Sequence, residues 1–455
     1  MNPVIHKRHL MAGAAFVSMA CSHGVVADDW TVDVKGVHRV LYEYLDNQFR
    51  QGRVGEEDIF NFRTGMTVTA TNGGLSAVVE IEDSRIYGLD DVRNVTPGQV
   101  NAVEPLQYYL AYEFDASSVF GAKAGVRAGR FTWPMGSGRI IGRNGYRNTR
   151  FSFLGARAHL ETDNGNRVEA FWMMPAEIRP NDTPSLDDNE IDHDRFSDDL
   201  TLAGVFAESK TLIEGVTSRG YAVWLDEDDD GTTGRQSRDR NLFTIGAQFQ
   251  KARSAGAWDF DIEGALQSGE RRQTASPLDV TDLDVEASFL HAEVGYTYGD
   301  SGLNLAVTYD FASGDDDPTD DESGLFDPIF GPIRGDLGPT GLFTLVHRNN
   351  MSAPGARLLY RSDNSWDLML HWQAIWLDSA TDSFGRIGVR DISGNSGTFT
   401  GHQIQGRFRM PVLDGKARFE VGAVSFQNGE FFDNAPNATG NGNPFFFYSA
   451  IEFFF

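Results

Sequence analysis

A basic segment between residues 126 and 157 concentrates the residue type best suited to binding carboxylates. It contains seven arginines and no acidic residue, within a chain whose net charge is −26. A planar guanidinium donates two parallel hydrogen bonds to one carboxylate, which suits it to acidic ligands. The segment is therefore expected to face an anionic solute rather than to form a neutral surface loop.

Further basic residues lie on the polar face of segments in which polar and apolar residues alternate. Rings of arginine and lysine are the recurring device of anion-conducting pores. The basic residues predicted to line the solute path are Lys35, Arg39, Arg63, Lys123, Arg127, Arg130, Arg139, Arg143, Arg147, Arg157, Arg357, Arg361, Arg407 and Arg409. Acidic residues such as Glu43, Glu80 and Glu169 share these faces. Two interpretations stay open: an electropositive path for an anion, or a self-neutralising charge network that supports the wall.

One stretch matches the beginning of a calcium-binding loop. Asp226, Asp228, Asp230 and Gly231 have the spacing with which an EF-hand begins. The position that needs a bidentate glutamate holds Ser237, so the motif is incomplete. We expect no cofactor, and calcium on the acidic loops is the alternative to plain solvated loops.

Motifs for catalysis are weak. Gly299-Asp300-Ser301-Gly302 matches the nucleophile sequence of trypsin-like proteases, but its place between two alternating segments predicts a hairpin turn. Gly-x-Ser-x-Gly, His-Glu-x-x-His and a phosphate-binding loop do not occur in the sequence. We expect no enzymatic activity, the alternative being a hydrolase built on a smaller outer-membrane barrel. The acidic net charge argues against nucleic acid as a partner.

β-strands must position the basic residues. From Asp28 onward the hydrophobic pattern has period 2, and turn residues divide it into about eighteen strands, beginning with Thr31–Leu45. Short turns alternate with long loops, which is the plan of bacterial barrels with short periplasmic turns and long extracellular loops. The predicted fold is thus all-β, a transmembrane antiparallel β-barrel. Gly341–Arg348 resembles a further strand, but we assign it to the long loop Gly314–Met351, the candidate plug.

The two faces of several predicted strands differ in polarity. Trp258 and Ile262 alternate with Asp259 and Glu263 in one strand near the middle of the chain. The apolar face is expected to contact lipid and the polar face to line a wet lumen. The period of two residues would also fit a soluble barrel with its polar face outside. The two ends of the chain must therefore decide which face of the strands points outward.

The N-terminus has the pattern of a secretory signal peptide. Lys7 and Arg8 precede an apolar core, and a cleavage site of small residues ends at Ala27. The expected domains are therefore a signal peptide at residues 1–27 and a single barrel at residues 28–455. Lipidation of Cys21 is the alternative, but the residue three positions before it is Ser18, where a lipobox usually has leucine.

The C-terminus is a strand-like stretch, Pro444–Phe455, that is rich in phenylalanine and carries one charge, Glu452. Its length is about that of one membrane-crossing strand. An unpaired edge inside hydrocarbon is too costly, so this strand should close the barrel against Thr31–Leu45. A terminal phenylalanine with alternating apolar residues behind it resembles the last strand of bacterial outer-membrane proteins, which predicts that location.

The basic segment also resembles the alginate-export family of outer-membrane porins. The matching motifs are Gly129-Arg130, Gly136-Ser137-Gly138-Arg139, Tyr146-Arg147-Asn148 and Phe153-Leu154-Gly155-Ala156-Arg157. The family usually has aspartate where this chain has Leu154, so an arginine–aspartate pair at that point is in doubt. The resemblance implies an eighteen-stranded barrel whose basic, constricted lumen passes a polyuronate across the outer membrane.

These observations favour a diffusion channel for an anionic polysaccharide or oligosaccharide, such as an alginate-like polyuronate, used in export. A general porin or an organic-acid uptake porin is the alternative. Expected partners are the saccharide, outer-membrane lipid and lipopolysaccharide, and periplasmic export proteins. Acidic loops at residues 182–199, 226–230 and 315–322 would repel a polyanion outside the cell and favour its release.

Overall fold

A computed structural model describes residues 30–88, 95–117, 121–229, 237–333, 335–363, 365–440 and 442–455. Nearly all regular structure in these residues is antiparallel β-sheet. The strands are β1 (Thr31–Asp46), β2 (Glu57–Asn72), β3 (Leu75–Tyr87), β4 (Asn101–Asp115), β5 (Lys123–Phe131), β6 (Phe153–Glu161), β7 (Arg167–Pro175), β8 (Leu200–Ile213), β9 (Val216–Glu227), β10 (Asn241–Lys251), β11 (Trp258–Arg272), β12 (Asp282–Thr297), β13 (Leu303–Ala312), β14 (Glu322–Ser323), β15 (Met351–Arg361), β16 (Asp367–Trp376), β17 (Phe399–Val412), β18 (Ala417–Asn428) and β19 (Phe445–Phe454). Two short helices, α2 (Thr183–Asp187) and α3 (Glu430–Asn434), lie in loops.

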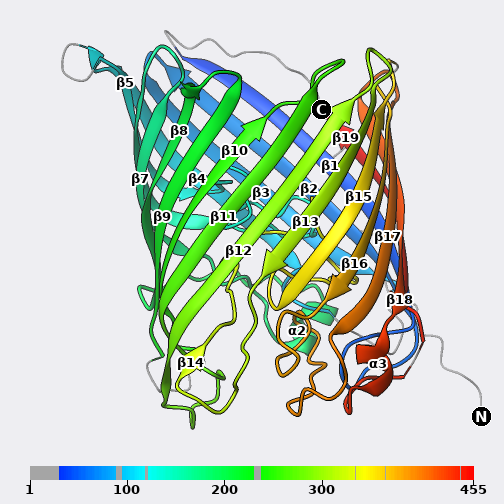
Figure 1. Cartoon of the computed structure of the whole chain (residues 1–455). Helices are drawn as coiled ribbons and strands as arrows, with labels where there is room; N and C mark the ends of the chain where they lie inside the picture. Colours follow the sequence, from blue (N-terminus) through cyan, green and yellow to red (C-terminus); the bar gives the residue numbers. More distant parts are fainter. Residues whose placement is uncertain are drawn as a thin grey trace, which may run out of the picture.

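The sheet closes on itself to form a barrel, as Figure 1 shows. β14 is a two-residue strand that pairs in parallel with β12, and the other eighteen strands form the antiparallel wall. β19 pairs with β1, so that Phe454 lies opposite Val37 and Glu452 opposite Arg39. This confirms the predicted fold class and the predicted closing strand.

The final residue is fixed against the first strand. Phe455 accepts a hydrogen bond from the Gly36 backbone N–H at 2.6 Å and donates its own N–H to the Gly36 carbonyl at 3.0 Å. The Phe455 ring lies over Gly36, where a methyl group on the glycine would clash with it. Both chain ends of the barrel therefore lie at the same rim.

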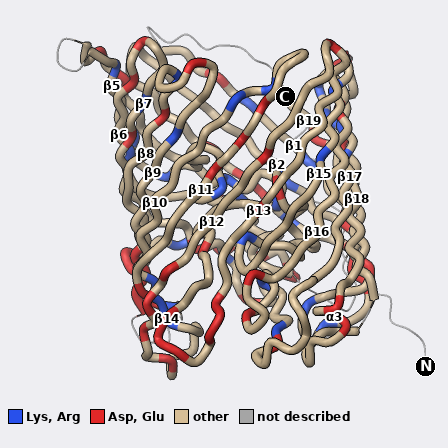
Figure 2. Tube along the Cα trace, viewed as in Figure 1, with Lys and Arg blue, Asp and Glu red and all other residues tan. Residues whose placement is uncertain are grey.

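Connections of two lengths divide the barrel into two ends (Figure 1). At one end, beside the C-terminus, short turns join β2 to β3, β6 to β7 and β17 to β18. At the other end, long loops join β5 to β6, β13 to β15 and β16 to β17. The short-turn end is the periplasmic end and the long-loop end the extracellular end of a bacterial barrel. Many of the acidic residues gather on the long loops (Figure 2).

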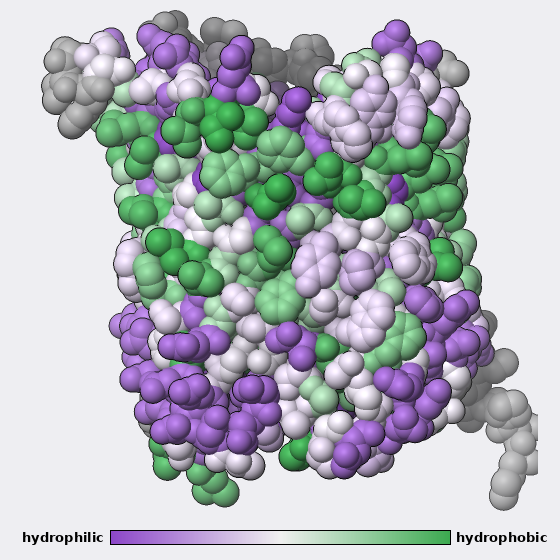
Figure 3. Space-filling model, viewed as in Figure 1, coloured by the Kyte–Doolittle hydropathy of each residue, from purple (hydrophilic) through white to green (hydrophobic). Residues whose placement is uncertain are grey.

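The outer surface is apolar across the height of the wall and hydrophilic at the rims, as one face shows in Figure 3. On β11 the outward side chains of Trp258 and Leu266 are 62% and 65% exposed, whereas Asp259 and Glu263 are 3% and 1% exposed. The alternation predicted from the sequence is therefore confirmed, with the apolar face outward. No helix in the described residues is long and apolar enough to cross a membrane.

Two long loops fold into the lumen instead of extending outward. Residues 132–152 and residues 325–350 meet there, and a parallel bridge joins Ile141 to Phe330. Leu345 and Arg348 in the second loop are fully buried. Gly341–Arg348 contains no strand, which agrees with its predicted place in an inward-folded loop. We call these two segments the inner loops.

Candidate functional site

The first inner loop is held by arginines of the wall. Arg39 on β1 donates to the carbonyl of Tyr146 at 2.7 Å, and Arg63 on β2 donates to the carbonyl of Arg147 at 2.8 Å. Both arginines also reach the Gly145 carbonyl. Most of their hydrogen bonds are thus directed to the backbone of the loop, and Arg63 also lies 3.6 Å from Glu452 on β19. These two predicted path residues act as anchors.

Arg139 joins both inner loops to the wall. Its guanidinium lies 2.8 Å from Asp336 in the second loop, 2.8 Å from Glu263 and 3.1 Å from Asp261 on β11. Arg348 also contacts Asp336 at 2.7 Å. Burial alone would raise the pKa of Asp336, but these arginines hold the pKa well below its ordinary value. Both loops are therefore fixed by buried charges.

The other arginines of the first inner loop are divided between acidic and aromatic partners. Arg143 lies 2.7 Å from Glu80 on β3, and Arg150 lies 3.1 Å from both Glu80 and Glu82. Arg147 stacks over the ring of Phe151, and no carboxylate of the described residues pairs with it. Arg147 is the member of this set that keeps an unneutralised charge.

The motif residues Arg130 and Arg157 are buried in ion pairs. Arg130 binds Glu104 on β4 and Asp194 in the loop after β7. Its opposite residue on β6 is Leu154, so these two acids supply the carboxylates that the leucine cannot. Arg157 pairs with Glu169 and covers the Trp133 ring at 3.9 Å.

The remaining predicted path residues lie along the wall. Arg127 stacks over the Tyr109 ring. Arg357 pairs with Glu293 on β12, and Arg407 and Arg409 share Asp367 on β16 at 3.1 Å and 3.0 Å. Three of the set are exposed near the periplasmic rim: Lys35, Lys123 and Arg361. The self-neutralising network therefore describes most of the predicted set.

A second group of cations, which the sequence analysis did not include, surrounds the outer mouth of the lumen. We call Arg147, Arg238, Arg271 and Arg386 the mouth arginines. Arg386 interacts electrostatically with Arg147 and Arg238, and Arg271 interacts with Arg238. None of the four guanidiniums forms an ion pair with a carboxylate of the described residues. The nearby Asp327 pairs with Arg240 at 2.7 Å and also attracts Arg271 and Arg386 without forming an ion pair with either.

The mouth arginines differ in access to solvent. Arg238 and Arg386 are exposed, and Arg271 on β11 is 3% exposed. Desolvation by the surrounding loops lowers the pKa of Arg147 to about 10. The Arg147 guanidinium is still charged at neutral pH. Burial lowers the pKa of His347 well below its ordinary value, so this histidine adds no charge there.

Sequence reasoning missed three of these residues for two reasons. Arg238 and Arg386 lie in loops, where no period assigns a side chain to the lumen. Arg271 lies on the inner face of β11, which continues to Arg272, four residues beyond its predicted end. The polar alternation through Gln267 could have been extended to find Arg271.

Two cavities open on the periplasmic side of the first inner loop. One of about 270 Å³ lies between Tyr146 and a charged wall, in which Arg407, Arg409 and Arg418 stand beside Glu420 and Glu452. The other, of about 360 Å³, lies between Trp133 and the β6–β8 wall, where Arg157 and Arg167 face it. Basic side chains therefore occur on both sides of the inner loops.

The predicted calcium loop is only partly visible. Asp226 and Asp228 are exposed at the extracellular end of β9, and Asp230 and Gly231 lie outside the described residues. The described residues form one grouping with metal-ligand chemistry, and it lies elsewhere, around His291. Calcium at Asp226 stays a prediction.

A closed eighteen-strand barrel with an apolar belt, a polar interior and inward-folded loops defines the class of outer-membrane channels. Residues 31–446 match the alginate-export family, and the chain belongs to that family. This confirms the resemblance, and it places the protein in the bacterial outer membrane. Family and fold are those of channel-forming porins rather than enzymes.

Solved structures share the fold at low sequence identity. Pseudomonas aeruginosa OpdQ is 12% identical, with 93% of this chain and 97% of that chain covered and a TM-score of 0.56. P. aeruginosa OccK8 (OprE) is 12% identical, with 93% and 98% covered and a TM-score of 0.58. P. aeruginosa OpdK, solved with vanillate, is 10% identical, with 93% and 98% covered and a TM-score of 0.55. No curated protein gives a significant sequence match.

Proposed function

We propose that this channel conducts an anionic polysaccharide or oligosaccharide, of the alginate-like polyuronate class, outward across the outer membrane. The observation that carries the proposal is the group of mouth arginines, none of which forms an ion pair with a described carboxylate and two of which share the attraction of Asp327 with Arg240. A buried or partly enclosed guanidinium without a carboxylate is costly to keep, and an acidic solute would supply the missing partner. The family to which the chain belongs supports the same solute class.

The distribution of charge along the lumen supports passage of a long anion. Arg407, Arg409 and Arg418 lie near the periplasmic rim. Arg147, in the first inner loop, and its neighbour Arg386 lie toward the outer mouth. A saccharide with a carboxylate on each unit could contact both groups at once. Outside the mouth, acidic loops would repel it, which favours release to the exterior (Figure 2).

Ion selectivity in planar bilayers tests the charge of the path. Under a KCl gradient, the wild-type channel is expected to prefer chloride. The triple variant Arg147→Gln, Arg238→Gln, Arg386→Gln should lose this preference, because it removes three charges without breaking an ion pair. Arg195→Gln is the control, since Arg195 is a loop arginine with a 62% exposed side chain and a solvent-exposed 3.7 Å contact with Asp192. A cation-selective wild-type channel would refute the proposal.

The size of the blocking solute separates this proposal from organic-acid uptake. Oligouronates should reduce the chloride current at lower concentration than the monomeric uronate, because several carboxylates engage several arginines. An uptake channel for a small acid should instead be blocked equally well by a monomeric carboxylate. Lipopolysaccharide and periplasmic export proteins remain the predicted partners of the outward route.

A further inference from the structure

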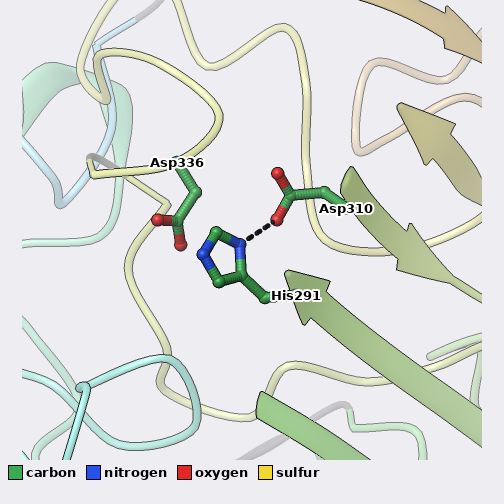
Figure 4. A group of neighbouring side chains, drawn as sticks. All are labelled: His291, Asp310 and Asp336. Carbon is green, nitrogen blue, oxygen red and sulfur yellow. Dashed lines mark hydrogen bonds and ion pairs between the residues drawn. The ribbon is translucent and has the colours of Figure 1, made fainter. Parts of the chain in front are cut away.

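Three buried side chains from separate segments meet beside the inner loops (Figure 4). His291 is on β12, Asp310 is on the neighbouring β13, and Asp336 is in the second inner loop. They are 1%, 1% and 8% exposed, and one potential ligand atom from each lies within 4.8 Å of the others. A nitrogen and carboxylate oxygens at this spacing are the donor set of a transition-metal site.

The hydrogen bonds leave the imidazole oriented for a ligand. His291 Nδ1 lies 2.7 Å from Asp310 Oδ1, so the Nδ1–H donates to the carboxylate, and in the neutral ring this leaves the lone pair on Nε2. Figure 4 shows Nε2 facing the Asp336 carboxylate, and among the described residues no group forms a hydrogen bond with Nε2. Metal-binding histidines commonly donate their second ring N–H to a carboxylate in this way.

Asp336 has one oxygen available beside its arginines. Arg139 Nε and Arg348 approach Oδ2 at 2.8 Å and 2.7 Å, whereas Oδ1 receives only a 3.3 Å contact from Arg139. Bonds of about 2.1 Å from a tetrahedral ion to Nε2 and Oδ1 would separate these two atoms by about 3.4 Å. That separation fits within the spacing that the three residues show.

The charges around the three residues favour a cation. Asp336, Asp261 and Glu263 place three carboxylates around the guanidiniums of Arg139 and Arg348, and Asp310 pairs with His291. When the imidazole is neutral, these four carboxylates outnumber the two guanidiniums by two negative charges. Asp310 Oδ2 is also buried without a hydrogen-bond partner. A divalent ion would neutralise this excess.

We propose that His291 and Asp336 bind a divalent transition-metal ion such as Zn²⁺, with Asp310 orienting the imidazole and water completing the coordination. The ion would tie the second inner loop to the β12–β13 wall. This inference does not depend on which solute the channel conducts. It gives the inner loops a metal-dependent attachment in addition to their ion pairs.

Zinc titration of the tag-free barrel in detergent micelles tests the site. Other histidine–carboxylate pairs, His159 with Glu113 and His193 with Glu104, are removed first by His159→Asn and His193→Asn. In this background, isothermal titration calorimetry should show one Zn²⁺ per chain. His291→Asn should abolish that binding, and Asp310→Asn should weaken it about 10-fold or more, as loss of an orienting carboxylate does.

A second readout keeps the test valid for variants with altered stability. Each variant is first shown to migrate as a folded barrel on a semi-native gel. In planar bilayers, micromolar ZnCl₂ should change the current noise of the background channel and leave that of the His291→Asn channel unchanged. The proposal is overturned if the background protein binds no Zn²⁺, or if folded His291→Asn binds it equally well.

Discussion

At the scale of single residues, Arg139 within the first inner loop and Arg386 at the outer mouth illustrate two uses of the same side chain. Arg139 is buried and bonded to Asp336, Glu263 and Asp261. Arg386 is exposed at the outer mouth, where Arg147 is among its neighbours. The first arrangement fixes the loops, and the second leaves charge available to a solute.

Replacing Arg139 should therefore cost stability. Arg139→Met removes the guanidinium that binds Asp261 and Glu263 and leaves Asp336 with Arg348 alone. Breaking a buried pair on one side typically costs about 3–5 kcal/mol. The free energy of unfolding, measured by urea titration of the barrel in lipid vesicles, should fall by that amount. Arg195→Met, at a 62% exposed side chain, should change it by less than about 0.5 kcal/mol. Equal effects at both sites would contradict the assigned role.

At the scale of elements, the second inner loop occupies lumen that an ordinary external loop would leave open. It carries buried apolar residues, among them Phe343 and Leu345, into the barrel. Its attachment points are adjacent, since Ala312 at the end of β13 lies opposite Met351 at the start of β15. The segment between them can therefore be replaced without stretching the wall.

A channel in which a four-residue turn replaces residues 314–349 should conduct several-fold more current than the wild type. The reason is the volume that the loop fills inside the lumen. Single-channel recording in KCl measures the change. The control is a channel in which residues 274–280 are shortened. These residues lie in an external loop where Leu278 is 91% exposed, so the conductance should stay unchanged. Unchanged conductance on removing residues 314–349 would show that this loop does not constrict the pore.

At the scale of the whole molecule, the outward apolar belt predicts which surface the lipid covers. Leu266 on β11 and Leu278 in the following loop are 65% and 91% exposed, but only Leu266 lies on the strand face that forms the belt. A side chain that is exposed in the isolated chain therefore faces either the hydrocarbon of the membrane or water.

Arginine substitution distinguishes these two surfaces. Leu266→Arg should destabilise the barrel in lipid vesicles by about 2–4 kcal/mol, the cost of a charge on the lipid face near the bilayer midplane. Leu278→Arg should be close to neutral because its side chain stays in water. Urea titrations of folding into vesicles give both values. Similar values for the two variants would place the assigned belt outside the bilayer.

The sequence predicted the strands of the barrel wall far better than the contacts of the side chains that line the lumen. Alternation along β11 was enough to put Trp258 outside and Glu263 inside, because a strand alternates its side chains whatever it pairs with. The same rule placed Arg39 and Arg357 on the inner face. It did not indicate their partners, the carbonyls of residues 145–147 and Glu293, because these belong to other segments.

By itself, then, the sequence determined the strands, their two faces and the closure of β19 on β1, because period and turns act locally. Only the tertiary structure decided which cations stay unpaired, because Arg139 and Asp336 are 197 residues apart. It also brought His291, Asp310 and Asp336 together from two strands and a loop. Spacing along the chain carries no signal for contacts that arise when loops fold into a closed barrel.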